Sequence, residues 1–158
     1  MSKLIEKLGS EDWLLADGAT GTNLFDMGLM SGDAPELWNI KYPALISNLY
    51  RDAVDAGSDI FLTNSFGGNA LRLKLHNLGI KAFELSKISA EIARNVADSS
   101  ERAFFVAGSI GPTGEIMEPI GDLSHKIAVE VFLEQAQGLK DGGADVLWLE
   151  TISAPEEF

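Results

Sequence analysis

Four short apolar runs divide the chain, and each ends at a polar residue. They are WLLAD ending at Asp17, DIFLTN ending at Asn64, AFFVAGS ending at Ser109 and DVLWLE ending at Glu150. Nearly continuous hydrophobicity, without alternation, is typical of strands that are buried on both faces. The pattern therefore predicts four strands of a parallel sheet.

Between these runs, apolar residues recur at helical spacing. Residues 45–54, 85–96 and 128–139 each carry one apolar stripe, as amphipathic helices do. Ser124 stands where a helix N-cap is expected, and Gly57 and the pair at 142–143 stand where helices should stop. The segments DAGSDIFLTN and DGGADVLWLE repeat one pattern of turn and strand, which indicates a repeated βα unit.

Composition narrows the class of protein. With 158 residues, of which 46% are hydrophobic, the chain is long enough for one ordinary domain. Its net charge of -12 argues against nucleic acid as a partner. It has no cysteine, no signal-peptide pattern and no apolar run near the roughly 20 residues that span a bilayer. We therefore expect a cytoplasmic protein that does not enter membranes.

Ligands of parallel α/β folds bind at the carboxyl ends of the strands. Asp17 and Glu150 bring carboxylates to that edge, where they either receive a substrate ammonium or cap neighbouring backbone. Gly18 and Gly21 allow a tight turn whose N–H groups suit a carboxylate or a phosphate. GATGTN lacks both the dinucleotide fingerprint and the P-loop lysine, which favours the carboxylate.

The predicted strands and helices indicate whether the tryptophan and histidine side chains lie in the core or at the surface. Trp13 and Trp148 lie in predicted strands and are expected in the core, whereas Trp38 could line a pocket. His76 and His125 fall in or at the start of predicted helices and are expected at the surface. The long loop GSIGPTGEIMEPIGDLS could cover a site.

Several short blocks of the sequence, taken together, resemble those of a known protein family. LLADGATGTNLFDMG, PELWN, DAGSDIFLTNSFGGN, VAGSIGPTGE and GGADVLWLET occur in this order over nearly the whole chain. With these blocks the chain resembles the homocysteine S-methyltransferase family, which includes betaine-homocysteine methyltransferases and the homocysteine-binding module of methionine synthase. Within the family, the blocks look most like bacterial betaine-type enzymes.

This resemblance implies a (β/α)8 TIM barrel that binds L-homocysteine at the carboxyl rim of its strands. Zinc would hold the thiolate, which would attack a methyl group of a cationic donor, with betaine favoured, to give methionine. Phe66 or Trp38 could hold the donor's cation through a π face. The implied substrate-binding residues are Asp17, Gly18, Ala19, Thr20, Thr63, Asn64, Phe66 and Glu150.

The chain departs from the family in its length and its metal ligands. The family binds zinc through three cysteines in the second half of the barrel, and none is present here. The resemblance therefore places these cysteines beyond Phe158, the last residue of the sequence. A TIM barrel has about 250 residues. We expect residues 1–158 to be the N-terminal part of one barrel, about its first four βα units, with no second domain.

Such a part of a barrel would lack half of the site. We expect it to hold no metal and no catalytic residue, and to be inactive alone. Its open sheet edges would favour homo-oligomers.

Two alternatives remain open at this point. The chain could be a complete doubly wound α/β domain that binds a phosphorylated ligand at residues 18–22. It could also be a non-catalytic half barrel that associates with itself.

Overall fold

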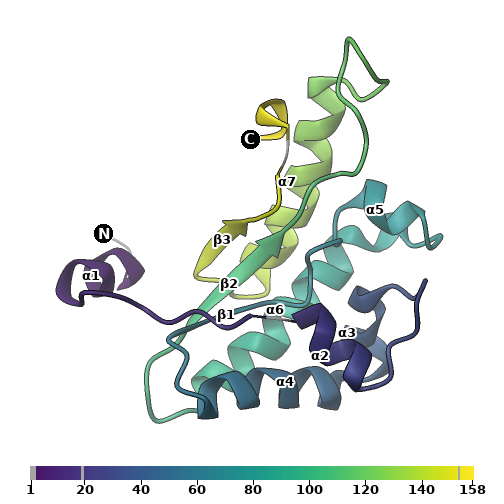
Figure 1. Cartoon of the computed structure of the whole chain (residues 1–158). Helices are drawn as coiled ribbons and strands as arrows, with labels where there is room; N and C mark the ends of the chain where they lie inside the picture. Colours follow the sequence, from purple (N-terminus) through teal and green to yellow (C-terminus); the bar gives the residue numbers. More distant parts are fainter. Residues whose placement is uncertain (1–2, 19, 153) are drawn as a thin grey trace.

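The computed structural model describes residues 3–18, 20–152 and 154–158. Its sheet has three parallel strands, β1 (Ile60–Leu62), β2 (Phe105–Ile110) and β3 (Val146–Leu149), in the order β1-β2-β3 (Figure 1). Phe61 pairs with Val106 and Gly108 with Leu147. The predicted parallel sheet, with sequential strands as neighbours, is confirmed for these three.

The first predicted strand is wrong as a regular strand. Residues 14–17 run beside β1 but form only an isolated parallel bridge, between Ala16 and Ile60. Two carboxylates interrupt the ladder: Asp59 accepts the N–H of Leu15 at 3.0 Å, and Asp17 accepts the N–H of Leu62 at 2.9 Å. Because side chains take these amides, the backbone ladder is not continuous.

The three predicted amphipathic helices are present as α4 (Pro43–Asp55), α6 (Ala82–Asp98) and α7 (His125–Asp141). Ser124 caps α7 by accepting the N–H of Ile127 at 3.4 Å. Gly57 and Gly143 follow α4 and α7 with φ of 94° and 96°, a left-handed conformation that favours glycine. The sequence therefore predicted both the faces of these helices and their ends.

The remaining elements are shorter. They are α1 (Lys3–Ser10), α2 (Thr20–Asp26), η1 (Pro35–Leu37), α3 (Trp38–Lys41), α5 (Ala70–Lys74), η2 (Gly79–Lys81) and η3 (Pro155–Glu157). Near the end of the sequence, Pro155 begins a single 3-10 turn. Phe158 follows this turn, donates its N–H to the Pro155 carbonyl at 3.1 Å, and is 85% exposed.

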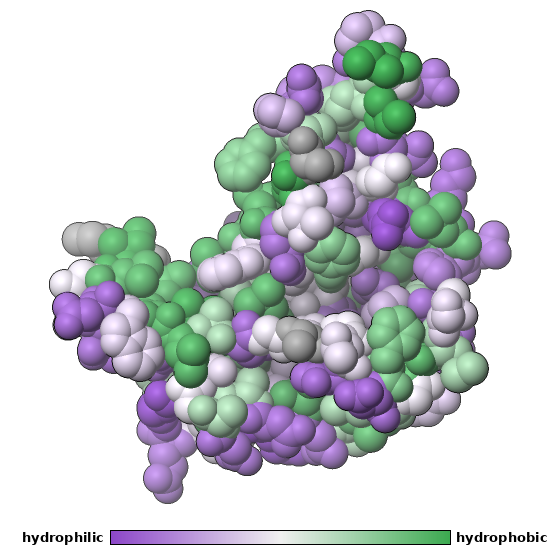
Figure 2. Space-filling view, in the orientation of Figure 1, coloured by the Kyte–Doolittle hydropathy of each residue, from purple (hydrophilic) through white to green (hydrophobic). Residues whose placement is uncertain are grey.

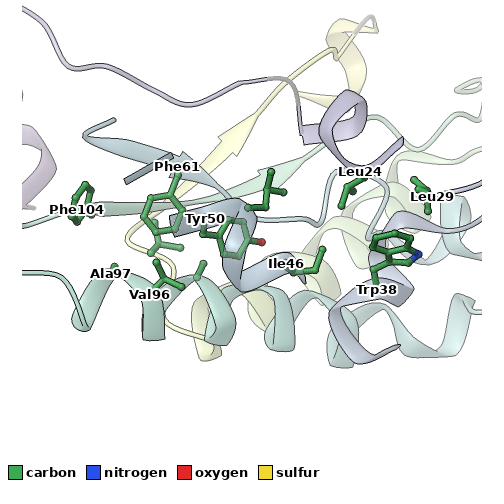
Figure 3. Close-up of a cluster of buried hydrophobic side chains, with 12 residues drawn as sticks. Leu24, Leu29, Trp38, Ile46, Tyr50, Phe61, Val96, Ala97 and Phe104 are labelled. Atoms are coloured by element: carbon green, nitrogen blue, oxygen red, sulfur yellow. The ribbon is translucent and has the colours of Figure 1, made fainter. Parts of the chain in front are cut away.

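Among the long helices, α4 packs on β1, and α6 and α7 pack on β2. The main core lies between them (Figure 3), where Tyr50 stacks on Phe61 with ring centroids 5.4 Å apart. On the opposite face a smaller cluster joins Ile60, Phe105 and Ala107. Leu4 of α1 packs against this smaller cluster.

The long loop that follows β2 extends away from the sheet. Residues 111–124 extend beside α7 to one end of the molecule (Figure 1). Ile116 and Ile120 are exposed there, and apolar surface gathers at this end in Figure 2. Ser109, near the start of the predicted loop, lines the cavity at the strand ends, whereas residues 111–124 supply none of its described lining residues. That this loop covers a site stays a prediction.

Candidate functional site

A cavity of about 420 Å³ lies at the carboxyl ends of the strands. Its described lining residues come from segments that are far apart in the sequence, as the strand-end rule predicts. They are Asp17, Gly18, Thr20, Gly21, Leu24, Pro35, Glu36, Leu62, Thr63, Asn64, Ser65, Phe66, Ser109, Trp148 and Glu150. The structure thus brings together seven of the eight predicted residues, and the eighth, Ala19, lies outside the described residues.

Asp17 is held at the cavity by its own backbone and by β1. Its N–H donates to the carbonyl of Ile60 at 2.9 Å, and its Oδ1 accepts the N–H of Leu62 at 2.9 Å. Burial, with a smaller contribution from the negative charge of Glu150, raises the pKa of Asp17 to about 6, although the Leu62 N–H lowers it. Asp17 is therefore a carboxyl that changes charge near neutral pH.

Glu150 enters the same cavity from the end of β3. Its N–H donates to the carbonyl of Ile110 at 3.1 Å, which continues the pairing with β2. The hydroxyl of Ser109 donates to Oε1 of Glu150. Thr151 then turns the chain with φ of 60°, in the left-handed region. Backbone pairing and one hydroxyl donor therefore fix this carboxylate in the cavity that it shares with Asp17.

A network of hydrogen bonds that involves side-chain hydroxyl groups joins the ends of β1 and β2. The N–H of Ser109 donates to Oγ1 of Thr63 at 3.0 Å, and the hydroxyl of Ser65 donates to the Ser109 carbonyl at 2.8 Å. Since Ser65 uses its proton there, Thr63 is the donor in their 2.6 Å contact. Gln135 of α7 donates to the Ser65 carbonyl at 2.7 Å. Thr63 is therefore engaged in holding strand ends in place.

Asn64 is similarly engaged by protein groups. Its N–H donates to the hydroxyl of Tyr50 at 2.7 Å, and its side-chain amide donates to the Pro35 carbonyl at 2.8 Å and to Asn39 at 3.1 Å. Asn39 donates back to the Asn64 carbonyl at 2.9 Å. This buried pair of amides fixes η1 and α3 against the end of β1, which completes one wall of the cavity.

Glu36 is a cavity residue that the sequence analysis missed. It is 4% exposed, and its Oε1 accepts the N–H of Gly67 at 2.7 Å. Burial raises the pKa of the Glu36 carboxyl, while the amide donors and the charges of His76 and Arg72 lower it. Its position in PELWN, within a block shared with the family, was the available signal.

All three tryptophans lie in environments that differ from those predicted. Trp38 was expected to line a pocket, but it is 7% exposed in the core, edge-on to Tyr42. Trp148 was expected in the core, but it lines the cavity, and Trp13 is 72% exposed. Side chains alternate along a strand, so Trp148 shares a face with Glu150 two residues later. Period-two counting from Glu150 would have placed Trp148 correctly.

The histidines lie away from the cavity lining. His76 follows α5 and is half-buried, and His125 is exposed at the start of α7. Neither therefore contributes a side chain to the site at the strand ends, as their expected surface positions indicated.

The described residues do not supply a metal centre. Within the described ranges, no group of three histidine, cysteine or acidic side chains could hold a metal ion. Thiolates are the ligands that the resemblance implies for zinc, and this chain has none. The residues present therefore do not fit a zinc site, and the position of the family's cysteines beyond Phe158 stays a prediction.

Comparison with known proteins identifies the family of this chain. The model of the homocysteine S-methyltransferase family matches residues 14–158. The chain therefore belongs to the homocysteine S-methyltransferase family, as its sequence blocks indicated. No helix in the part of the chain that the structure describes is long and apolar enough to cross a membrane.

Curated relatives include two methionine synthases. That of Mycobacterium leprae is 33% identical over 147 residues, which are 87% of this chain and 12% of the relative. That of Mycobacterium tuberculosis is 32% identical over 151 residues, or 90% of this chain and 13% of the relative. This chain thus spans a small part of the length of either relative.

Solved structures of a homocysteine methyltransferase, MmuM from Escherichia coli, have the same fold. The metallated form gives a TM-score of 0.80 at 26% identity, covering 96% of this chain and 58% of that chain. The oxidized form gives 0.78 at 28% identity, covering 95% and 56%. The described α/β fold is therefore similar to that of this enzyme over little more than half of the enzyme's length.

Proposed function

We propose that this chain forms the amino-acid-binding part of an enzyme that transfers a methyl group to the thiol of L-homocysteine, giving methionine. The observation that supports this function is that Asp17 and Glu150 line one cavity together with Gly18 and Thr20. Two acids suit an ammonium, and N–H groups at the start of α2 have no partner within the helix. The cavity thus offers acidic side chains for the ammonium of an amino acid and backbone N–H groups for its carboxylate.

The other cavity residues have roles that follow from their charge and their hydrogen bonds. Glu150, held by Ser109, pairs with the ammonium, and Asp17 supports it from the opposite segment. Gly18 and Thr20 supply N–H groups to the substrate carboxylate, and Ala19, which lies outside the described residues, stays a predicted binding residue. The Thr63 and Asn64 side chains are engaged by protein groups, so they shape the pocket, while Phe66 faces the methyl donor.

For the donor we propose betaine, whose methyl groups are on a quaternary nitrogen. The sulfur would form its bond to carbon as the carbon–nitrogen bond breaks, and the electron pair would stay on nitrogen. The aromatic rings of Phe66 and Trp148 line the cavity, and such rings attract onium cations. This chain's residues would then bind and orient both substrates, which is a contribution of positioning.

Metal activation of the thiol requires ligands that the described residues do not supply. We propose that residues 1–158 are about the first four βα units of a (β/α)8 barrel, and that this part by itself forms no methionine from homocysteine and betaine. Turnover by the purified 158-residue chain would contradict this proposal.

Substrate binding can be tested by calorimetric titration of the chain with L-homocysteine. The Glu150→Gln variant keeps the side-chain shape but loses the charge, so we expect affinity to fall at least about tenfold. Glu156→Gln, at an exposed acid of η3, is the matched control. Absence of homocysteine binding by the unmodified chain would refute the proposed function.

The phosphate-binding alternative is less well supported. Three acids and none of the described lysines, arginines or histidines line the cavity, an arrangement that repels phosphate. A non-catalytic half barrel that associates with itself remains the second candidate, because Leu147, Trp148 and Leu149 of β3 are exposed. Dimerisation without affinity for homocysteine would favour it.

A further inference from the structure

Glu36 lies in the cavity wall, and the ion pairs of the described residues do not include it. Its carboxyl accepts its own backbone N–H and, through Oε1, the N–H of Gly67 at 2.7 Å, whereas His76 and Arg72 act on it only through space. At 4% exposure, an ionised carboxyl costs free energy unless a cation or more donors compensate it. This carboxyl therefore suits a cationic ligand.

Phe66 adds an aromatic surface beside this carboxyl. It immediately precedes Gly67, which is the amide partner of Glu36, and it lines the same cavity. The ring packs closely on Gly111, where a Cβ would come within 2.6 Å of a ring carbon. With 37% of the residue exposed, the remaining ring surface is available to a ligand. A carboxylate and a ring together are typical of sites for onium cations.

The acidic side chains of the cavity outnumber the single ammonium of the proposed amino acid, so a second cation can also bind. Its described lining has three acids, Asp17, Glu36 and Glu150, and no basic side chain. The proposed amino acid brings one ammonium, which Glu150 and Asp17 take from their side of the cavity. Glu36 belongs to a different segment, so its charge is available to a second ligand.

We infer that Glu36 is a specificity-determining residue, the counter-charge that makes this cavity accept a cationic methyl donor and reject a neutral one. This inference rests on the proposed function and adds a residue to it. The donor's positive charge disappears as the methyl leaves, because the bonding electrons stay on the donor atom. Glu36 therefore stabilises the bound donor more than the transition state, and it contributes to affinity and selectivity.

The test compares two probes of equal shape by calorimetric titration of the 158-residue chain. Choline carries a trimethylammonium group, and dimethylbutanol, with carbon in place of nitrogen, is its neutral isostere. We expect the unmodified chain to bind choline about tenfold more tightly than the isostere. Glu36→Gln keeps an oxygen for the Gly67 N–H but removes the charge, so choline affinity should fall about tenfold and isostere affinity should not change.

Two further variants control the comparison. Phe66→Leu should also weaken choline more than the isostere, and Glu101→Gln, at an exposed acid outside the cavity lining, should change neither. Equal losses for both probes in Glu36→Gln would make Glu36 a structural residue and overturn the inference, as would no measurable choline binding by the unmodified chain. L-homocysteine is titrated separately, so its failure to bind would refute the proposed function without deciding choline selectivity.

Discussion

Ser109, near the end of β2, donates its hydroxyl proton to Oε1 of Glu150, which follows β3. Neighbouring parallel strands thus fix the carboxylate on which the proposed recognition of the ammonium depends. Ser109 is 2% exposed, and its backbone is itself held by Thr63 and Ser65. The position of Glu150 is therefore a property of the sheet.

Removal of this hydroxyl gives the first prediction. In Ser109→Ala, Glu150 loses a donor that orients it, and we expect L-homocysteine affinity to fall about three- to tenfold. Mercaptobutyrate, which lacks the amino group, should bind with unchanged affinity. Calorimetric titration of both compounds measures this, and an equal loss for both would show that the hydroxyl acts on the whole cavity.

Gln135 gives a prediction about stability. This fully buried side chain links α7 to the strand ends through the Ser65 and Ser109 carbonyls, at 2.7 and 3.3 Å. Gln135→Leu should lower the free energy of unfolding by about 1–3 kcal/mol, because buried carbonyls lose a donor. Gln137→Leu, on the exposed side of the same helix, is the control. Urea unfolding compares them, and equal effects would contradict this role.

The pKa of Asp17 predicts a pH dependence of stability. Because burial and Glu150 raise this pKa from 3.8 to about 6, the folded state binds the proton more tightly than the unfolded state. Protonated Asp17 therefore contributes to the free energy of unfolding, and this contribution is fully present below about pH 4 and is lost as pH rises through 6. Comparing Asp17→Asn with the unmodified chain isolates this effect from that of Glu36.

Across this pH range we expect the unmodified chain to lose about 1–2 kcal/mol of stability relative to Asp17→Asn, since part of the carboxyl is exposed to screening solvent. Urea unfolding from pH 4 to 7 measures the difference between the two proteins. A constant difference, or one that changes in the opposite direction, would contradict the raised pKa.

Gly138 gives a prediction about the contact between α6 and α7. A Cβ at Gly138 would lie 2.5 Å from the Phe83 carbonyl oxygen. Gly138→Ala should therefore destabilise the fold by about 1–3 kcal/mol, although alanine is the better helix former. Gly9→Ala in α1 meets no atom within 4 Å and should be neutral or slightly stabilising. Thermal unfolding of both variants checks the opposite signs.

The exposed face of β3 predicts self-association. Leu147 is 43% exposed and lines an apolar groove between β3 and α7, which Phe158 also lines. We expect the chain to sediment as more than a 17.0 kDa species at micromolar concentration, and Leu147→Lys to shift it toward monomer. Leu75→Lys, at a residue that is 69% exposed elsewhere, should have no effect. A monomer in all three proteins would contradict this expectation.

Much of the fold could be read from local patterns. The apolar stripes gave α4, α6 and α7, and the glycines after α4 and α7 adopt the left-handed conformation expected of them. The first strand failed because Asp17 and Asp59 take amides that a ladder needs, and a hydrophobicity pattern carries no information about such pairing. The three misplaced tryptophans show the same limit, because apolar character does not say which face a side chain occupies.

By itself, the sequence determined the order of three strands and three long helices, the family and the residues at the strand ends, because each depends on short blocks and on the rule that parallel strands end at one edge. Only the tertiary structure decided that Glu36 joins Asp17 and Glu150 and that Ser109 orients Glu150. It also decided that Thr63 and Asn64 are engaged in scaffolding. The bonds of Asn64 with Asn39 and of Ser109 with Thr63 join residues 25 and 46 positions apart, and such bonds form only when strands and helices pack.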